Sequence, residues 1–370
     1  MRYLVIYGTR PEAIKLAPLL AALRKKKTVE IIEVNSAQHS DMLSPLFKEL
    51  ALSPNYNLAL RRTGQSLAEF TACLKDALIP IYLKTHPDAV LVQGDTATAL
   101  VAAETAFLES IPVLHIEAGL RSHDLFSPFP EEYCRRVIAL TASHHFAPTE
   151  DAKENLIREK ISPEAITVTG NTGIDHLVSV LDDGFTHPIL EQARGKRLIL
   201  FTAHRRENWG EPLGEALAAM ATLLAAHPEC LLFYPMHKNP DIREAAQNAL
   251  RDTENAILSE PLSPYVFSNL LFRADAVFTD SGGIQEEAVA LGKPTLVLRN
   301  RTERGEGVRS GHLTLTPCRY QDVLTAGEAL LASLANTAPP PSTLYGTGNA
   351  STIIANLLAD ENFLKNFKQI

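Results

Sequence analysis

Short apolar runs alternate with amphipathic stretches along most of the chain. In the first half the apolar runs cover residues 4–7, 31–34, 89–92, 113–116, 145–147 and 166–168. The intervening segments 13–26, 67–83 and 97–108 carry apolar residues at the three- and four-residue spacing of a helix. Because a strand–helix–strand series favours parallel strands joined by crossover helices, this half predicts a doubly wound parallel sheet.

The same pattern starts again in the second half. Apolar runs recur at 198–202, 231–234, 256–258, 276–278 and 295–298, with helical stretches near 213–226 and 285–290. A polar stretch without clear periodicity, residues 182–196, separates the two series. The length of 370 residues also exceeds what one hydrophobic core usually spans, so two domains are expected.

The predicted fold class is therefore α/β, with two Rossmann-like, doubly wound parallel-sheet domains facing a cleft. We expect an N-terminal domain over residues 1–170, a C-terminal domain over 171–355 and a tail over 356–370. In such sheets ligands bind at the carboxyl ends of the strands, so those ends are where candidate site residues are sought.

Composition and charge exclude several classes of function. The net charge is −8 and the one compact basic cluster is residues 24–27, so a nucleic-acid partner is not expected. The four cysteines lie far apart and form no C-x-x-C pair, which favours neither a zinc site nor a disulfide framework. An apolar strand pattern begins at once and no apolar run reaches membrane-spanning length, so a cytoplasmic protein without membrane contact is expected.

The segment Asp280-Ser281-Gly282-Gly283 follows an apolar strand and leads into a helix. Two glycines allow a ligand close to the backbone, and the free N–H groups and dipole of a helix N-terminus attract anions. A diphosphate would fit this turn, and Glu286 or Glu287 could accept hydrogen bonds from sugar hydroxyls. The alternative is an ordinary N-cap serine followed by acidic residues in the first turn.

Basic side chains follow other strands. Residues 8–15 form a strand-to-helix turn that matches neither G-x-G-x-x-G nor a P-loop, so neither a dinucleotide nor a P-loop phosphate is indicated. Arg10 and Lys15 could bind an anionic ligand there, or could belong to a solvated surface. The loop 299–304, which ends in Arg304, allows the same two interpretations.

Carboxylates end or follow three successive units of the first half. Asp95, Glu117 and Glu131 would converge at one sheet edge, where clustered carboxylates acquire shifted pKa values and can transfer protons. Each also has a structural alternative. Asp95 could cap a helix, Glu117 could pair with Arg121, and Glu131 could be a first-turn charge.

Two histidines follow strands of the second half. His204 stands beside Arg205 and Arg206, and His237 stands beside Lys238. Imidazole and cationic groups near the Ser-Gly-Gly turn favour phosphate recognition with general acid catalysis over polar loop residues of no function.

Taken together, these motifs resemble the non-hydrolysing UDP-N-acetylglucosamine 2-epimerases. The matching segments are 8–15, 37–39, 94–96, 117–121, 130–132, 170–172, 204–208, 280–288 and 302–304, and the resemblance extends from residue 1 to about residue 358. It implies a fold like the GT-B glycosyltransferases, a homodimer and no nicotinamide or other cofactor. The implied activity interconverts UDP-N-acetylglucosamine and UDP-N-acetylmannosamine, in the service of cell-envelope polysaccharide biosynthesis.

The resemblance also implies roles for single residues. Proton transfer and UDP elimination would involve Asp95, Glu117, Glu131 and His204. Substrate binding would involve Arg10, Lys15, Arg135, His237, Ser281, Gly282, Gly283, Glu287 and Arg304, with Glu287 on the ribose. A second UDP-N-acetylglucosamine, acting as an allosteric activator, would contact Gln38, His39 and His237. No metal site is implied.

Several positions depart from the family pattern. Gln93 stands where a histidine is common, Tyr133 and Cys134 replace Ala-Asn, and Gly305 replaces a proline. At the allosteric positions, Asp41 and Gly64 stand where Gln and Arg occur in other members, which leaves activation open. The alternatives for function are a retaining glycosyltransferase of the GT-B fold, a hydrolysing epimerase and a non-catalytic nucleotide-sugar sensor.

Overall fold

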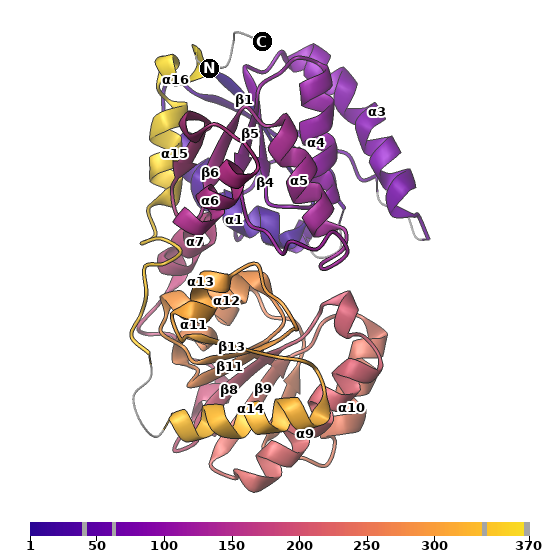
Figure 1. Cartoon of the computed structure of the whole chain (residues 1–370), viewed down its shortest axis with the longest axis vertical. Coiled ribbons are helices and arrows are strands. Elements are labelled where there is room, and N and C mark those ends of the chain that lie inside the picture. Colours follow the sequence, from indigo (N-terminus) through magenta and orange to yellow (C-terminus); the bar gives the residue numbers. More distant parts are fainter. Residues whose placement is uncertain (39–42, 61–63, 335–338, 366–370) are drawn as a thin grey trace. The chain divides into compact units, whose positions relative to one another are not determined.

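The computed structural model describes residues 1–38, 43–60, 64–334 and 339–365. The chain forms two compact units (Figure 1). Unit 1 comprises Met1–Val178 together with Tyr345–Ile370, and unit 2 comprises Ser179–Leu344.

Unit 1 is built on a seven-stranded parallel sheet with the order β3-β2-β1-β4-β5-β6-β7. Its strands are β1 (Arg2–Tyr7), β2 (Glu30–Asn35), β3 (Tyr56–Asn57), β4 (Ala89–Gln93), β5 (Val113–Ile116), β6 (His144–Ala147) and β7 (Ile166–Val168). Its helices are α1 (Arg10–Leu23), α3 (Leu67–Thr85), α4 (Ala97–Leu108), α5 (Glu131–Thr141), α6 (Glu150–Arg158), α7 (Thr172–Val180), α15 (Ala350–Leu358) and α16 (Glu361–Lys365).

Alternating side chains of β1 explain the two covered faces of this sheet. Tyr3, Val5 and Tyr7 are buried in a core shared with α1 and α15. Leu4 and Ile6 point to the other face and pack in a core shared with α3, α4 and α5. A strand buried on both faces reads as a continuous apolar run, which is the pattern that the sequence shows.

Unit 2 repeats this architecture with a six-stranded parallel sheet of order β10-β9-β8-β11-β12-β13. Its strands are β8 (Arg197–Thr202), β9 (Cys230–Pro235), β10 (Ala256–Ser259), β11 (Ala276–Thr279), β12 (Thr295–Leu298) and β13 (Leu313–Thr316). Its helices are α8 (Pro188–Gln192), α9 (Glu211–Ala226), α10 (Pro240–Leu250), α11 (Pro264–Arg273), α12 (Gly282–Ala290), α13 (Gly305–Arg309) and α14 (Tyr320–Ser333).

Successive side chains of β8 also point to opposite faces of the sheet and pack in two separate parts of the core. Ile199 and Phe201 pack with α9, α10 and α14, whereas Leu198 and Leu200 pack with α8, α11 and α12. The predicted fold class of two doubly wound parallel α/β domains is confirmed by these sheets. Among the described residues, no helix is both long enough and apolar enough to cross a membrane.

The structure divides the chain differently from the predicted boundaries at 170 and 355. The division falls within the last turn of α7, and the chain returns to unit 1 at Tyr345. Asp175 of α7 accepts hydrogen bonds from the backbone N–H groups of Ala350 and Ser351, at 3.2 and 2.7 Å, which fixes the start of α15. The apolar face of α15 packs on α1, so the last helices belong to the first core and are not a tail.

Strand order reverses between β1 and β4 in unit 1, and between β8 and β11 in unit 2. Loops that leave neighbouring strands at such a switch point diverge to opposite faces and leave room for ligands at the carboxyl edge. The loops after β1 and β4 carry Arg10 and Asp95, and those after β8 and β11 carry His204 and Ser281. These four predicted site residues therefore lie where each sheet favours ligand binding.

Candidate active site

Glu12 joins the loops after β1 and β4. Its carboxylate is buried and accepts hydrogen bonds from the N–H groups of Gly8 and Thr9, at 3.0 and 2.8 Å, and from the Thr96 hydroxyl at 2.6 Å. Burial raises the pKa of Glu12, while these hydrogen bonds oppose the shift. Glu12 thus links the turn before Arg10 to the turn that contains Asp95 through hydrogen bonds. We did not predict this role, although the Thr9-x-x-Glu12 capping box was a visible signal.

Asp95 is held by an arginine and does not cap a helix. The cap of α4 is Thr96, whose hydroxyl accepts from the N–H of Ala99, so the structural alternative for Asp95 is wrong. Arg135 donates from Nη1 to Asp95 Oδ2 at 3.0 Å and from Nε to Glu132 Oε2 at 3.2 Å. Arg135 is almost fully buried and orients a candidate acid in this structure.

Glu117 lies directly after β5 in a left-handed backbone conformation, with φ of +65°. Its Oε2 accepts hydrogen bonds from Lys15 Nζ at 2.5 Å and from Gln93 Nε2 at 2.7 Å. Arg121 pairs with Glu159. Because a left-handed conformation is costly for a residue with a side chain, the surrounding contacts must hold Glu117 in place.

Glu131 is the first residue of α5 and is half-buried. The first-turn position that we considered as its structural alternative is therefore observed. This position favours a negative charge, because the N–H groups of the first turn and the helix dipole face it. The structure thus leaves both interpretations of Glu131 in place.

The Ser-Gly-Gly turn begins α12 in unit 2. Ser281 is the N-cap residue, as the structural alternative has it, but within the described residues its side chain makes no capping hydrogen bond. A Cβ atom on Gly282 would lie 2.6 Å from Arg304 Nη1, whereas one on Gly283 would meet no described atom within 4 Å. Gly282 thus permits a close internal contact, and Gly283 leaves the outer side of the turn open.

Arg304 and Glu286 lie beneath this turn. Arg304 Nε donates to Glu286 Oε1 at 2.8 Å, and Nη1 donates to Glu303 Oε2 at 3.1 Å. Glu286 is 1% exposed, so our suggestion that it could accept hydrogen bonds from sugar hydroxyls is wrong. Glu287 is half-buried and stays the candidate for that contact.

Asp280 orients His204. Its buried carboxylate lies 3.1 Å from His204 Nδ1 and also accepts from the backbone N–H groups of His204 and Arg205. Burial alone would raise the pKa of Asp280, but the His204 ring and these hydrogen bonds outweigh it and lower the pKa. A carboxylate partner on Nδ1 fixes the orientation of the ring, and His204 stays a candidate to contact a ligand through Nε2. Sequence reasoning missed this role, because it depends on contact between two loops.

His237 lies beside His204. The two rings are stacked with their centroids 6.5 Å apart. Burial lowers the pKa of His237, and the neighbouring His204 lowers it further. A neutral imidazole next to the oriented His204 could accept a hydrogen bond from a ligand.

The predicted allosteric residues are only partly described. Gln38 accepts a hydrogen bond from the Thr98 hydroxyl at 2.9 Å, at the start of α4. His39 and Asp41 lie outside the described residues. Gln38 is therefore near the Asp95 turn, and the second binding site stays a prediction.

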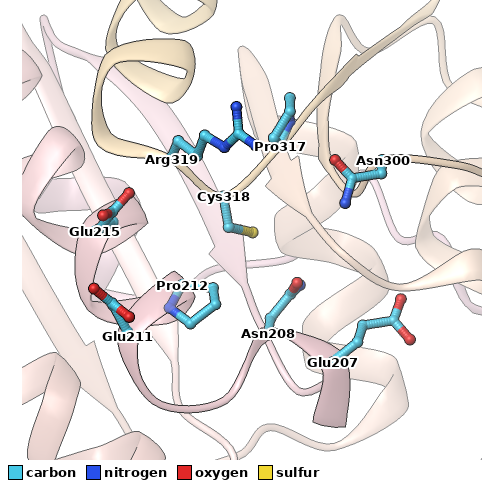
Figure 2. A pocket seen from close by; sticks show the side chains of 9 residues that line it. All are labelled: Glu207, Asn208, Glu211, Pro212, Glu215, Asn300, Pro317, Cys318 and Arg319. Atoms are coloured by element: carbon cyan, nitrogen blue, oxygen red, sulfur yellow. The ribbon is translucent and has the colours of Figure 1, made fainter.

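A surface pocket in unit 2 is lined on one side by residues between Glu207 and Glu215 (Figure 2). Cys318 and Asn208 point into it from opposite sides, and Asn208 also donates to Asp280. The pocket contains none of the predicted site residues; its lining is Glu207, Asn208, Glu211, Pro212, Glu215, Asn300, Pro317, Cys318 and Arg319. Within the described residues, no group of three or more His, Cys, Asp or Glu side chains is arranged to hold a metal ion.

The fold and the candidate site define a two-domain Rossmann-like α/β protein with carboxylates at strand ends of one unit and a Ser-Gly-Gly turn at a helix N-terminus of the other. The sequence profile described as UDP-N-acetylglucosamine 2-epimerase matches residues 21–359. The chain belongs to this family. The UDP-N-acetylglucosamine 2-epimerase of Bacillus subtilis is 39% identical, over 99% of this chain and 97% of the relative.

Solved structures agree with this assignment. The UDP-N-acetylglucosamine 2-epimerase of Neisseria meningitidis, bound to UDP-N-acetylglucosamine, is 38% identical with a TM-score of 0.91, covering 97% of this chain and 99% of that one. The S. aureus MnaA structure with UDP is 40% identical with a TM-score of 0.90, covering 96% of this chain and 95% of that one.

Proposed function

We propose that the protein interconverts UDP-N-acetylglucosamine and UDP-N-acetylmannosamine without hydrolysing either of them. Family membership supports epimerisation at C2, and the ligands in the N. meningitidis and S. aureus structures support a UDP-sugar substrate. The observation that carries the proposal is that hydrogen bonds orient two carboxylates, Asp95 and Glu117, at the carboxyl edge of the sheet in unit 1. In unit 2, the Ser-Gly-Gly turn at the start of α12 supplies a helix N-terminus that is suited to a diphosphate.

In the proposed reaction a carboxylate removes the C2 proton, and the electrons of the C2–H bond form a C1=C2 double bond. The C1–O bond breaks and its electron pair leaves with UDP, which gives a glycal and UDP. Re-addition of UDP to C1, with protonation of C2 from the other face, gives the epimer. Asp95, Glu117 and Glu131 are the proposed proton-transfer groups, because carboxylates near the ring can act as base and then as acid.

Departure of UDP places extra negative charge on the diphosphate. The N-terminus of α12 and the Asp280-bound His204 are suited to stabilise that charge, since oriented donors stabilise charge as it develops. Arg10 is proposed to add a cation, and Glu287 to bind the ribose. Arg304 is proposed to support the turn from beneath, since its guanidinium pairs with Glu286 and Glu303.

A homodimer is also proposed. Leu83, Leu108 and Leu140 are 57%, 59% and 76% exposed, and they lie at the C-terminal ends of α3, α4 and α5. Since α4 packs against both α3 and α5, we infer that a second copy of the chain covers these exposed apolar ends. Sedimentation should give twice the chain mass, and Leu140→Glu should shift it toward the monomer. The proposed setting is cytoplasmic supply of cell-envelope polysaccharide synthesis.

Product analysis tests the proposed activity against its alternatives. Incubation with UDP-N-acetylglucosamine should give UDP-N-acetylmannosamine while the total of UDP-sugar stays constant, as followed by phosphorus NMR. Release of UDP with free N-acetylmannosamine would identify a hydrolysing epimerase. Release of UDP only when an acceptor sugar is present would identify a glycosyltransferase, and no turnover with tight binding would identify a sensor.

A further inference from the structure

Two side chains cross between β4 and β5 in opposite directions. Gln93, at the end of β4, donates from Nε2 to Glu117 Oε2 at 2.7 Å. His115, on β5, lies with Nε2 2.7 Å from the carbonyl oxygen of Gly94. The first bond therefore reaches the loop that carries Glu117, and the second reaches the residue before Asp95.

Both crossing bonds are buried between strands in register. Gln93 and His115 are 2% and 0% exposed. Gln93 pairs with Ile116 in the sheet, and the Gly94 N–H donates to the Ile116 carbonyl at 2.9 Å. Buried hydrogen bonds to a charged group are stronger than those between neutral groups. The hydrogen bond from Gln93 therefore constrains the orientation of the Glu117 carboxylate.

In both hydrogen bonds, the chemistry of the acceptor determines which group donates. A carboxylate that also binds Lys15 can only accept, so the Gln93 amide must donate its N–H. Burial lowers the pKa of His115 to about 4, so the ring is neutral near pH 7. Since a carbonyl oxygen accepts, the neutral ring must carry its proton on Nε2.

The backbone conformation of Glu117 requires stabilising contacts from the residues around it. Its φ of +65° is a costly conformation for a residue with a side chain, and the carboxylate sits at the end of that turn. Lys15 anchors it from α1 and Gln93 anchors it from β4, both at Oε2. Two anchors on one oxygen set the rotation of the carboxylate.

We propose that Gln93 and His115 form a clasp that fixes the orientation of Glu117 and of the Gly94-Asp95 turn relative to each other. Both are positioning residues, since they act through the two carboxylates. The inference rests on the proposed function, which gives Asp95 and Glu117 their part in the reaction.

The first test removes one donor. Gln93→Met keeps the length of the side chain and loses the N–H, so kcat should fall about tenfold to a hundredfold while KM and UDP affinity change less than about twofold. Gln93→His restores a donor at the same position and should recover turnover to within about fivefold of wild type. Wild-type kcat in Gln93→Met, or a loss of UDP affinity equal to the loss of kcat, would overturn the proposal.

The second test addresses His115 with a matched control. His115→Phe should lower kcat about tenfold or more with unchanged UDP affinity. His144→Phe changes a buried imidazole on the neighbouring strand, whose Nε2 contacts Thr167, and should leave kcat within about twofold of wild type. Equal losses of kcat in the two variants would show that burial alone matters, and would reject the clasp.

A third measurement does not require activity. Carboxyl carbon NMR of UDP-bound protein should show a higher pKa for Glu117 in Gln93→Met than in wild type, because a lost donor favours the protonated form. An unchanged titration would contradict the clasp even if epimerisation is confirmed. Conversely, a raised pKa in a protein without epimerase activity would support the clasp and reject the proposed function.

Discussion

The three candidate carboxylates of unit 1 differ chiefly in the groups that contact them. Asp95 is held by the buried Arg135, whereas Glu117 is held by Lys15 and Gln93. Glu131 begins α5, where a carboxylate lies within reach of the helix dipole. Three environments for three carboxylates suit a reaction that needs a base, an acid and an orienting group.

Amide replacement tests these carboxylates. Asp95→Asn, Glu117→Gln and Glu131→Gln should each lower turnover by at least about a hundredfold, because each change removes a proposed proton-transfer group and keeps the shape. UDP affinity, measured by calorimetry, should change little. Glu104→Gln, at an exposed position of α4, is the control and should keep wild-type turnover. Near-normal turnover in any of the three variants would remove that residue from the catalytic set.

Sequence reasoning at this scale identified residues that directly follow strands. The positions of Asp95, Glu117 and His204 just after strands could be predicted, because the apolar runs before them indicate those strands, while their roles stay predictions. The roles of Gln93 and Asp280 could not be predicted, since they depend on contacts between loops from different strands. Glu286 was misjudged for the same reason, because its partner Arg304 lies 18 residues further along the chain.

At the scale of elements, the start of α12 is a compact turn with two different glycines. Gly282→Ala would force a methyl group against Arg304, and should lower stability by about 1–3 kcal/mol and UDP affinity about tenfold. Gly283→Ala meets no described atom, so it should keep the wild-type melting temperature while lowering UDP affinity. Thermal unfolding and calorimetry measure both effects. Equal stability of the two variants would contradict the packing of Arg304 under the turn.

The strand β6 contains a buried imidazole with a predictable pH effect. Burial lowers the pKa of His145 from 6.5 to about 3, and neither ring nitrogen has a hydrogen-bond partner among the described residues. The unfolded chain therefore binds a proton below pH 6.5 that the folded chain does not bind. Stability should fall as the pH drops, by at most roughly 1.4 kcal/mol per pH unit for this group.

His145→Leu tests that effect, because leucine cannot titrate. Denaturant unfolding between pH 7 and 4 should show a shallower loss of stability in the variant than in wild type. His123→Asn, at an exposed position, is the control and should show the wild-type slope. An identical slope in His145→Leu and wild type would show that this imidazole is not buried in its neutral form.

Helices such as α5, α10 and α14 were not predicted from the sequence. Most of the described strands could be predicted from their apolar runs, and the exceptions have physical reasons. Strand β3 has two residues, and β13 alternates leucine with threonine, so neither presents an apolar run. Helix α1 begins at Arg10, ahead of its first periodic residue, because the capping box of Thr9 and Glu12 sets its start.

At the scale of the whole molecule, the C-terminal segment returns to unit 1. Leu358 of α15 is fully buried in the core with α1, and Tyr3 donates to its carbonyl oxygen at 2.7 Å. The sequence pattern predicted a tail from residue 356 and could not say which of two similar sheets this segment covers. That choice depends on shape and on the Asp175 contacts at the start of α15.

Leu358→Ala tests this return. The change should lower the stability of unit 1 by about 2–5 kcal/mol, because it leaves a cavity under α15. Thr352→Ala, on the exposed side of the same helix, should change stability by less than about 0.5 kcal/mol. Hydrogen exchange would locate the loss in β1 and α1, and a loss located in β8 and α9 would contradict the assignment of α15 to unit 1.

In the proposed reaction one UDP-sugar loses and regains its C2 proton. Incubation with UDP-N-acetylglucosamine in deuterated water, followed by proton NMR, shows whether that proton exchanges with solvent. We expect UDP-N-acetylmannosamine that carries deuterium at C2, formed without added NAD. Epimer formation with the original proton retained at C2, or no exchange in folded protein, would contradict the proposed reaction.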